Sequence, residues 1–116
     1  MAASEAICQQ GGVTTTQYQA MLALGCAPET LSMKQLAQQL ILQHHSAVQL
    51  VDRLAKAGLV ERIASARDGR IALVVLTAKG ESKLGKLAEL HMAELLKQEP
   101  QLATSLAQLK NARETQ

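Results

Sequence analysis

Aromatic side chains are nearly absent from this sequence of 116 residues, which contains one tyrosine, no phenylalanine and no tryptophan. The core must therefore be built from aliphatic residues and methionine, which suit helices that pack closely. The scarcity of rings also argues against stacking on single-stranded nucleic acid, because that mode of binding needs exposed aromatic side chains.

Cysteines are also few, since the chain has only Cys8 and Cys26 and no CxxC pair. We therefore expect no disulfide framework and a reducing compartment, the cytoplasm. The N-terminus lacks the basic and apolar regions of a secretory signal, and no apolar run reaches the length of about 18 residues that a membrane span needs. P-loop, dinucleotide and nucleophile motifs are missing too, so the sequence predicts no enzyme and no cofactor.

The net charge of +2 and the isoelectric point near 8.7 favour a polyanionic partner only weakly. The placement of the charges therefore has to decide the kind of partner. The length predicts one domain that spans residues 1–116.

Two helices are predicted in the first third of the chain. Thr14 and Gln17 have the spacing of a capping box and predict a helix that runs to about Leu24. Ser32 is a good N-cap for a second, short helix that ends at Leu40. A polar cluster then separates this short helix from the next one.

A third helix is predicted over Gln43–Ala57, with Gly58 as its natural end. Its aliphatic residues fall on one face: Ala47, Leu50, Val51 and Leu54. The opposite face, with its flank, is polar: His45, Gln49, Asp52 and Lys56, with Ser46 and Arg53 beside them. Since the aliphatic face must be buried, the polar face is expected to meet solvent or a partner.

The pattern then changes to strands over Leu59–Ser65 and Ile71–Thr77, and Asp68-Gly69 between them signals a hairpin turn. Thr77 caps a long helix, Ala78–Gln98, that Pro100 ends. Short helices are also expected at Ala3–Gln10 and Gln101–Ala112. The predicted fold class is mainly α with a small β-hairpin wing, a winged helix-turn-helix with C-terminal dimerisation helices.

In a helix-turn-helix, the N-terminal part of the second helix enters the major groove of DNA. Gln49 has the amide that pairs with adenine, and His45 and Ser46 suit several base edges. The hairpin tip carries Arg67 and Arg70, and arginine suits the narrow minor groove. Asp68 would repel phosphate, so we expect it to pair with Arg70 or Arg67 and to stabilise the wing.

Four segments in this order and spacing resemble the MarR family of winged-helix regulators. They are TTTQYQAMLAL (Thr14–Leu24), LVDRLAKAGLVER (Leu50–Arg62), DGR (Asp68–Arg70) and VLTAKG (Val75–Gly80). The resemblance implies a homodimer that binds a palindromic operator, acts more often as a repressor than as an activator, and responds in some cases to a small-molecule effector. Ile41 departs from the family, because a glycine is common at its position in the turn.

The resemblance, together with the polar face, assigns the candidate DNA-binding residues. These are Gln43, His44, His45, Ser46, Gln49, Arg53, Lys56, Arg62, Arg67 and Arg70. Residues 13–77 would form the DNA-binding part and residues 78–112 the helices that pair two subunits. The candidate dimer interface is a set of leucines: Leu84, Leu87, Leu95, Leu102, Leu106 and Leu109. The alternative is that these leucines pack on their own winged domain.

Weaker signals leave other functions open. His91 and Glu94 have an i, i+3 spacing but no further ligands for a metal, so His91 is expected to be a packing residue with its ring partly exposed, and no metal site is predicted. Cys8 and Cys26 are expected to be buried and inert rather than redox sensors, because no basic residue adjoins either one. The second functional hypothesis is a winged-helix module that binds a protein partner and no DNA.

Overall fold

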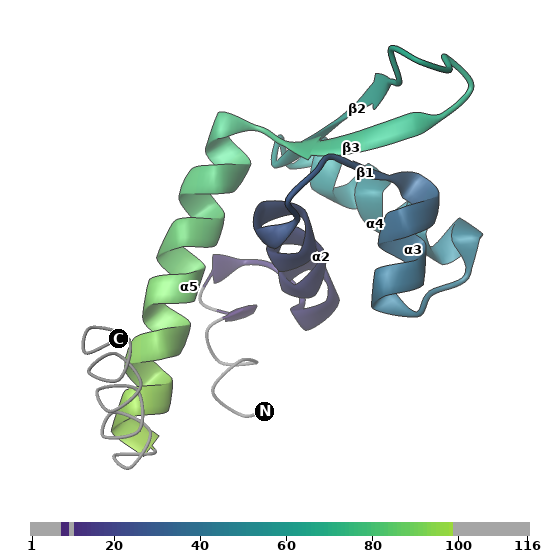
Figure 1. Ribbon diagram of the computed structural model, residues 1–116. Helices are drawn as coiled ribbons and strands as arrows, with labels where there is room; N and C mark the ends of the chain where they lie inside the picture. The colour runs from purple at the N-terminus through teal and green to yellow at the C-terminus, as the bar shows by residue number, and fades with distance from the viewer. Residues whose placement is uncertain (1–7, 10, 99–116) are drawn as a thin grey trace, which may run out of the picture.

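The computed structural model describes residues 8–9 and 11–98. Its elements are α2 (Thr15–Cys26), β1 (Leu31–Ser32), α3 (Met33–Leu40), α4 (His44–Lys56), β2 (Val60–Ala64), β3 (Ala72–Leu76) and α5 (Ala78–Gln98). The sheet lies across α2, α3 and α4, and α5 runs beside α2 and extends beyond the rest of the molecule (Figure 1). None of the described helices combines the length and apolar character that a bilayer crossing requires.

Side-chain caps start the first two helices. Before α2, the Thr14 hydroxyl accepts the Gln17 backbone N–H and the Gln17 side chain accepts the Thr14 N–H, each at 3.0 Å, so the predicted capping box is confirmed. Ser32 and Gln35 form a second capping box before α3, where only the N-cap was predicted. The helix α2 ends at Cys26, two residues beyond the predicted end.

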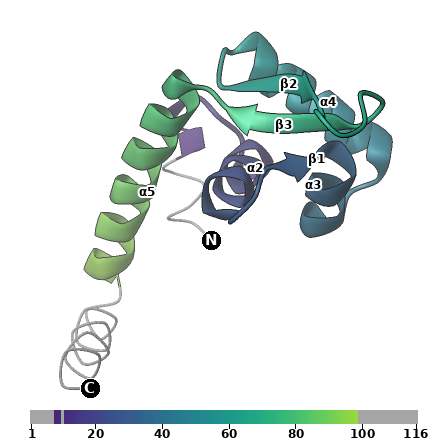
Figure 2. The same cartoon turned by 45° about the horizontal axis from the view of Figure 1, so that its top comes forward.

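The three strands form an antiparallel sheet in the order β1-β3-β2 (Figure 2). The predicted hairpin is confirmed, with each strand one residue shorter at both ends than expected and Val60 opposite Leu76. The short strand β1 was not predicted. It pairs Leu31 with Val74, so it closes the inner edge of the hairpin against the start of α3.

The aliphatic face of α4 is buried as predicted, because Ala47, Leu50, Val51 and Leu54 all belong to the core. The core also includes Tyr18, which is the chain's one aromatic residue. With the hydrophobic side of α4 used in this way, its other side is left on the surface. The helix ends as expected at Gly58, which has a φ of +76°.

The long helix α5 packs on α2 through two kinds of contact. A hydrogen bond of 3.2 Å joins the Tyr18 hydroxyl group to Nδ1 of His91, and the two rings meet edge to face at 5.7 Å. His91 is therefore a half-buried packing residue, as predicted. Leu87 is 2% exposed and lies against Gly11, and Leu84 lies against Gly25.

These contacts correct one part of the predicted dimer interface. Leu87 is buried inside its own chain, so it belongs to the core and offers no surface to a second subunit. Leu84 also packs against the core, while Leu95 is half-buried. Leu102, Leu106 and Leu109 lie outside the described residues, as do the predicted helix Gln101–Ala112 and most of Ala3–Gln10.

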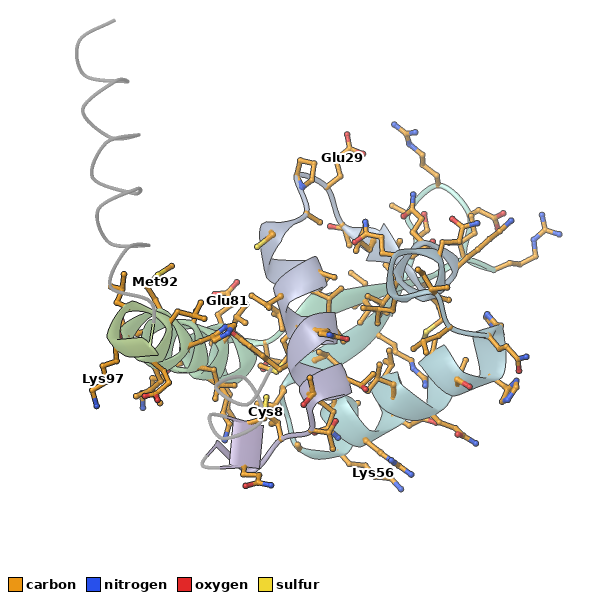
Figure 3. All side chains as sticks on the ribbon, turned by 90° about the horizontal axis from the view of Figure 1, so that it is seen from below. Cys8, Glu29, Lys56, Glu81, Met92 and Lys97 are labelled. Atoms are coloured by element: carbon orange, nitrogen blue, oxygen red, sulfur yellow. The ribbon has the colours of Figure 1, made fainter. Side chains whose placement is uncertain are left out.

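The expectation that both cysteines are buried holds for only one of them. Cys8 is buried beside α2, and burial raises the pKa of its thiol, although a hydrogen bond with Thr15 opposes this shift. Cys26 is exposed, because it is the last residue of α2 and its side chain lies outside the helix packing. Figure 3 shows Cys8 beside α2.

Candidate nucleic-acid interface

The outer face of α4 is a continuous polar surface. His44, His45, Gln49, Arg53 and Lys56 are exposed, while Ser46 is half-buried. Of these side chains, those of His45, Gln49 and Lys56 lie opposite the buried Leu50 and Leu54, as a repeat of 3.6 residues requires, and the other three flank them. In Figure 3, Lys56 projects into solvent at the C-terminal end of this surface. We refer to these six residues, together with the N-cap Gln43, as the α4 polar face.

The N-terminus of α4 differs from those of α2 and α3, which are capped by side chains. Gln43 occupies the N-cap position in extended backbone, but its side chain makes no capping hydrogen bond. The first backbone N–H groups of α4 therefore have no side-chain partner of the kind that Thr14 and Ser32 supply to α2 and α3. Such N–H groups, together with the positive end of the helix dipole, favour an anion such as a phosphate.

The turn between α3 and α4 is made by Ile41 in a left-handed conformation. Its φ is +55° and ψ +49°, and its side chain is 91% exposed. The turn closes with hydrogen bonds from the Ile41 N–H to the carbonyl of Gln38 and from the Leu42 N–H to that of Ala37. The backbone that glycine favours is thus kept, at a cost in strain for a β-branched residue.

Polar groups of the hairpin tip hold its loop in shape. The Ser65 hydroxyl accepts the Arg67 backbone N–H at 3.2 Å, and the Asp68 carboxylate accepts the Arg70 N–H at 3.0 Å. The loop runs from residue 65 to residue 71, and Gly69 does not adopt a positive φ. The tip is therefore a longer connection than the two-residue turn that the Asp-Gly pair signals.

Two arginine side chains extend from this tip. Arg70 is paired with Asp68 through its Nε at 3.3 Å, as expected from the sequence, and yet its side chain is 92% exposed. Arg67 is exposed as well. The pair engages one edge of the Arg70 guanidinium, so the acid restricts this side chain while most of it stays accessible.

Arg62 is placed differently from the other candidate residues. Its guanidinium group is turned toward α4, where it pairs with the Asp52 carboxylate and donates to the Val48 carbonyl oxygen at 3.2 Å. The sequence had indicated Arg62 as a residue that contacts DNA. One of its guanidinium nitrogens, Nη2, makes both of these contacts with α4 of its own chain.

The structure adds residues that sequence reasoning missed. A hollow of about 290 Å³ separates the polar face from the start of α2, where it is lined by Thr14, Thr16 and Gln17. A second hollow, of about 410 Å³, lies between α4 and the hairpin and is rimmed by Lys34, Arg62 and Arg70. The sequence could have indicated Lys34, because this residue lies in the first turn of α3, two positions after the N-cap Ser32.

A third hollow, of about 650 Å³, lies between the end of α2, the loop that follows it, β3 and α5. Leucine and valine side chains form part of its wall, and Cys26, Glu29 and Glu81 also line it. Figure 3 shows Glu29 on the loop and Glu81 on α5. Among the described residues, no group of three or more histidine, cysteine or acidic side chains is arranged to hold a metal ion.

Comparisons with known proteins agree with this geometry. The sequence pattern that defines the MarR family matches residues 11–71, a little more than half of the chain. Among proteins with curated functions, none matches the chain in sequence.

Many solved structures have the same fold. AbsC, a MarR family transcriptional regulator from Streptomyces coelicolor, is 25% identical with a TM-score of 0.77, over 94% of this chain and 76% of its own. NadR, solved in complex with 4-hydroxyphenylacetate, is 28% identical with a TM-score of 0.77, over 99% and 82% of the two chains. Wild-type MarR from E. coli is 24% identical with a TM-score of 0.76, over 96% and 86%.

Proposed function

Because this chain belongs to the MarR family, we propose that it is a transcriptional regulator, of the repressor type, that reads a specific sequence in double-stranded DNA. The α4 polar face enters the major groove, and the hairpin tip with Arg67 and Arg70 enters the neighbouring minor groove. Bound protein blocks access to a promoter.

The observation that carries this proposal is the exposure of the α4 polar face beside an arginine-tipped hairpin. Gln49 is exposed on the N-terminal half of α4, where a bidentate contact with adenine is geometrically natural. Ser46 and His45 precede it, and the N-terminus of α4 lacks a side-chain cap. Arg53 and Lys56 lie further along the helix, where they suit phosphates better than bases.

We further propose that two copies pair through the C-terminal region, residues 78–112, and bind a palindromic operator. Two-fold symmetry in the protein matches two DNA half-sites that lie about one helical turn apart. Leu90 and Met92 support this arrangement, because both are exposed on α5 although they are large and apolar. Met92 projects from the part of α5 that lies beyond the sheet (Figure 3).

A small organic effector is part of the proposal. The hollow of about 650 Å³ has the size of a pocket for a small molecule, and it lies where α5 meets the DNA-binding part. A relative, NadR, was solved with 4-hydroxyphenylacetate. An effector in this hollow would act by favouring one orientation of α5, and therefore one spacing of the two α4 helices.

The test is selection of bound duplexes from a random pool, followed by affinity measurements at two salt concentrations. We expect a palindromic consensus, and an affinity that falls steeply as salt rises, because phosphate contacts release counterions. Failure to bind any duplex would favour the second hypothesis, a winged-helix module that binds a protein partner.

A further inference from the structure

Ile41 is the most exposed of the large apolar side chains on this surface. Its side chain is 91% exposed, whereas the other exposed large apolar side chains of the described residues are 44–46% exposed. Its two chain neighbours, Leu40 and Leu42, are partly buried and pack against the core. The side chain of Ile41 therefore projects away from its own chain and adds almost nothing to the packing of the fold.

The backbone of Ile41 is also held in an unfavourable conformation. With a φ of +55°, it is the one residue other than glycine that has a positive φ in the described part of the chain. A β-branched side chain raises the energy of this conformation, and a glycine would avoid the cost. Residues held in such conformations are concentrated at binding and active sites. An isoleucine that is kept here without packing points to a contact outside the free chain.

The turn that carries Ile41 lies next to the part of α4 that is proposed to meet DNA. Ile41 precedes the N-cap Gln43 by two residues, and the N-terminal part of the second helix of a helix-turn-helix enters the major groove. The turn between α3 and α4 and the tip of the hairpin both lie at the end of the molecule farthest from α5 (Figures 1 and 2). A duplex that meets the start of α4 and the hairpin tip thus also meets this turn.

An aliphatic side chain can recognise only one feature of the major groove. The base edges carry hydrogen-bond donors and acceptors, and the 5-methyl group of thymine is the one apolar group among them. The exposed residues near Ile41 in the chain are polar, namely Gln39, Gln43 and His44. A protein partner would need a larger apolar patch. A single aliphatic side chain among polar neighbours suits one methyl group.

We propose that Ile41 reads thymine: its side chain packs against the 5-methyl group of one thymine in each half-site and so selects a T·A pair there. This inference rests on the proposed DNA-binding function and gives a base preference to a residue outside α4. The turn is fixed by a hydrogen bond from the Ile41 N–H to the Gln38 carbonyl oxygen. A second one runs from the Leu42 N–H to the Ala37 carbonyl oxygen. The side chain is thus oriented before binding, which lowers the entropy that the contact costs.

The experiment compares the selected operator duplex with duplexes in which deoxyuridine replaces one thymine at a time. This replacement removes the 5-methyl group and leaves every hydrogen-bonding group of the base pair unchanged. We expect one position in each half-site at which the replacement weakens binding by wild type about fourfold, the effect of one buried methyl group. Ile41→Gly should bind both duplexes equally at that position. Its salt slope should equal that of wild type, because no phosphate contact is lost.

Two control variants distinguish this contact from a general effect of the turn. Ile41→Val keeps a branched aliphatic side chain on the same backbone, so it should retain most of the loss that deoxyuridine causes. Ile63→Ala removes an exposed aliphatic side chain from β2, on the opposite face of the strand from Arg62, and should retain all of that loss.

The possible outcomes separate this inference from the proposed function. Wild type that binds the operator equally well with deoxyuridine at every thymine position overturns the inference and leaves the proposed function standing. A loss that persists unchanged in Ile41→Gly overturns it too, because the methyl group then meets another side chain. If wild type binds no duplex at all, the proposed function fails and this inference fails with it.

Discussion

The hydroxyl group of Thr77 donates a hydrogen bond of 2.6 Å to the carbonyl oxygen of Gly58, which joins the start of α5 to the end of α4. The same hydroxyl oxygen accepts the Gly80 backbone N–H at 3.0 Å and so caps α5, as the sequence predicted for Thr77. Lys79 adds a hydrogen bond of 2.9 Å from its Nζ to the Ala57 carbonyl oxygen. The direction of α5 is thus set in part by contacts with the end of α4.

This joint leaves no room for a side chain at Gly80. A Cβ atom there would overlap the carbonyl oxygen of Leu59, which is backbone and cannot move aside easily. We expect Gly80→Ala to lower the free energy of unfolding by about 1–3 kcal/mol, as overpacking does. Urea unfolding followed by circular dichroism measures this loss.

Gly85 supplies the matched control on the same helix. A Cβ atom at this position meets no other atom within 4 Å, and the residue is exposed. Gly85→Ala should raise the free energy of unfolding by about 0.5–1 kcal/mol, because alanine favours a helix more than glycine does. Equal effects of the two substitutions would contradict the close approach at Gly80.

At the strained turn between α3 and α4, glycine is expected to give a more stable protein than the residue that is present. Ile41→Gly should stabilise the protein by about 0.5–1 kcal/mol, because glycine adopts the left-handed backbone without the steric cost of a Cβ atom. The side chain is 91% exposed, so its removal loses almost no buried apolar surface. Ile41→Ala, which keeps the Cβ atom, is the control and should change the melting temperature little. A glycine variant that melts below wild type would show that the turn is not strained.

The raised pKa of Tyr18 predicts that the protein loses stability in alkaline solution. Burial is the main cause that raises the pKa of Tyr18, and the nearby thiols of Cys8 and Cys26 raise it further. The folded protein therefore holds this proton more tightly than the unfolded chain does. The resulting stability is complete below the unfolded pKa of about 10 and is lost as the pH rises through the higher folded pKa.

The ultraviolet absorbance of tyrosinate measures this titration without interference, since Tyr18 is the only tyrosine. We expect ionisation to coincide with unfolding. Tyr18→Phe should remove the loss of stability that the ionisation of Tyr18 causes in alkaline solution. Ionisation of Tyr18 at its ordinary pKa in a protein that stays folded would contradict the burial argument.

The two cysteines should differ in their reaction with a thiol reagent. Cys26 is exposed and should react within the mixing time of an ordinary assay. Cys8 is buried and burial raises the pKa of its thiol, so it has little thiolate and should react only as the protein unfolds. Cys26→Ser should abolish the fast phase, and Cys8→Ser should abolish the slow one. Two fast phases in the native protein would disagree with the packing of Cys8.

Substitutions of Gln49 and Arg70 should distinguish a contact with a base from a contact with a phosphate or with the minor groove. Gln49→Ala should change the preferred base at one position of each half-site, at a cost of about 1–3 kcal/mol if the contact is bidentate. Arg70→Ala should weaken binding to all duplexes and reduce the salt slope by about 0.9 if this residue neutralises a phosphate. The measurement is affinity for a panel of single-base operator variants. An unchanged ranking of that panel after Gln49→Ala would exclude base reading by this residue.

Sequence alone determined the local features of this protein. The starts of the helices follow from Thr14 and Ser32, because a capping side chain acts on backbone N–H groups only a few residues away. The buried face of α4 follows from a repeat of 3.6 residues, and the hairpin follows from two aliphatic runs around a turn signal. The same repeat predicted that His45, Gln49 and Lys56 are exposed, whereas Gln43 and His44 were assigned through the resemblance to the MarR family.

Tertiary structure decided what depends on residues far apart in the chain. The strand β1 has only two residues, and it exists because Leu31 meets Val74, more than forty positions away. The orientation of Arg62 toward Asp52 and Val48, the burial of Leu87 and the exposure of Cys26 likewise depend on which element packs against each residue. Periodicity and capping carry no information about such neighbours, because the energy of packing is set by the arrangement in space and not by the order of residues.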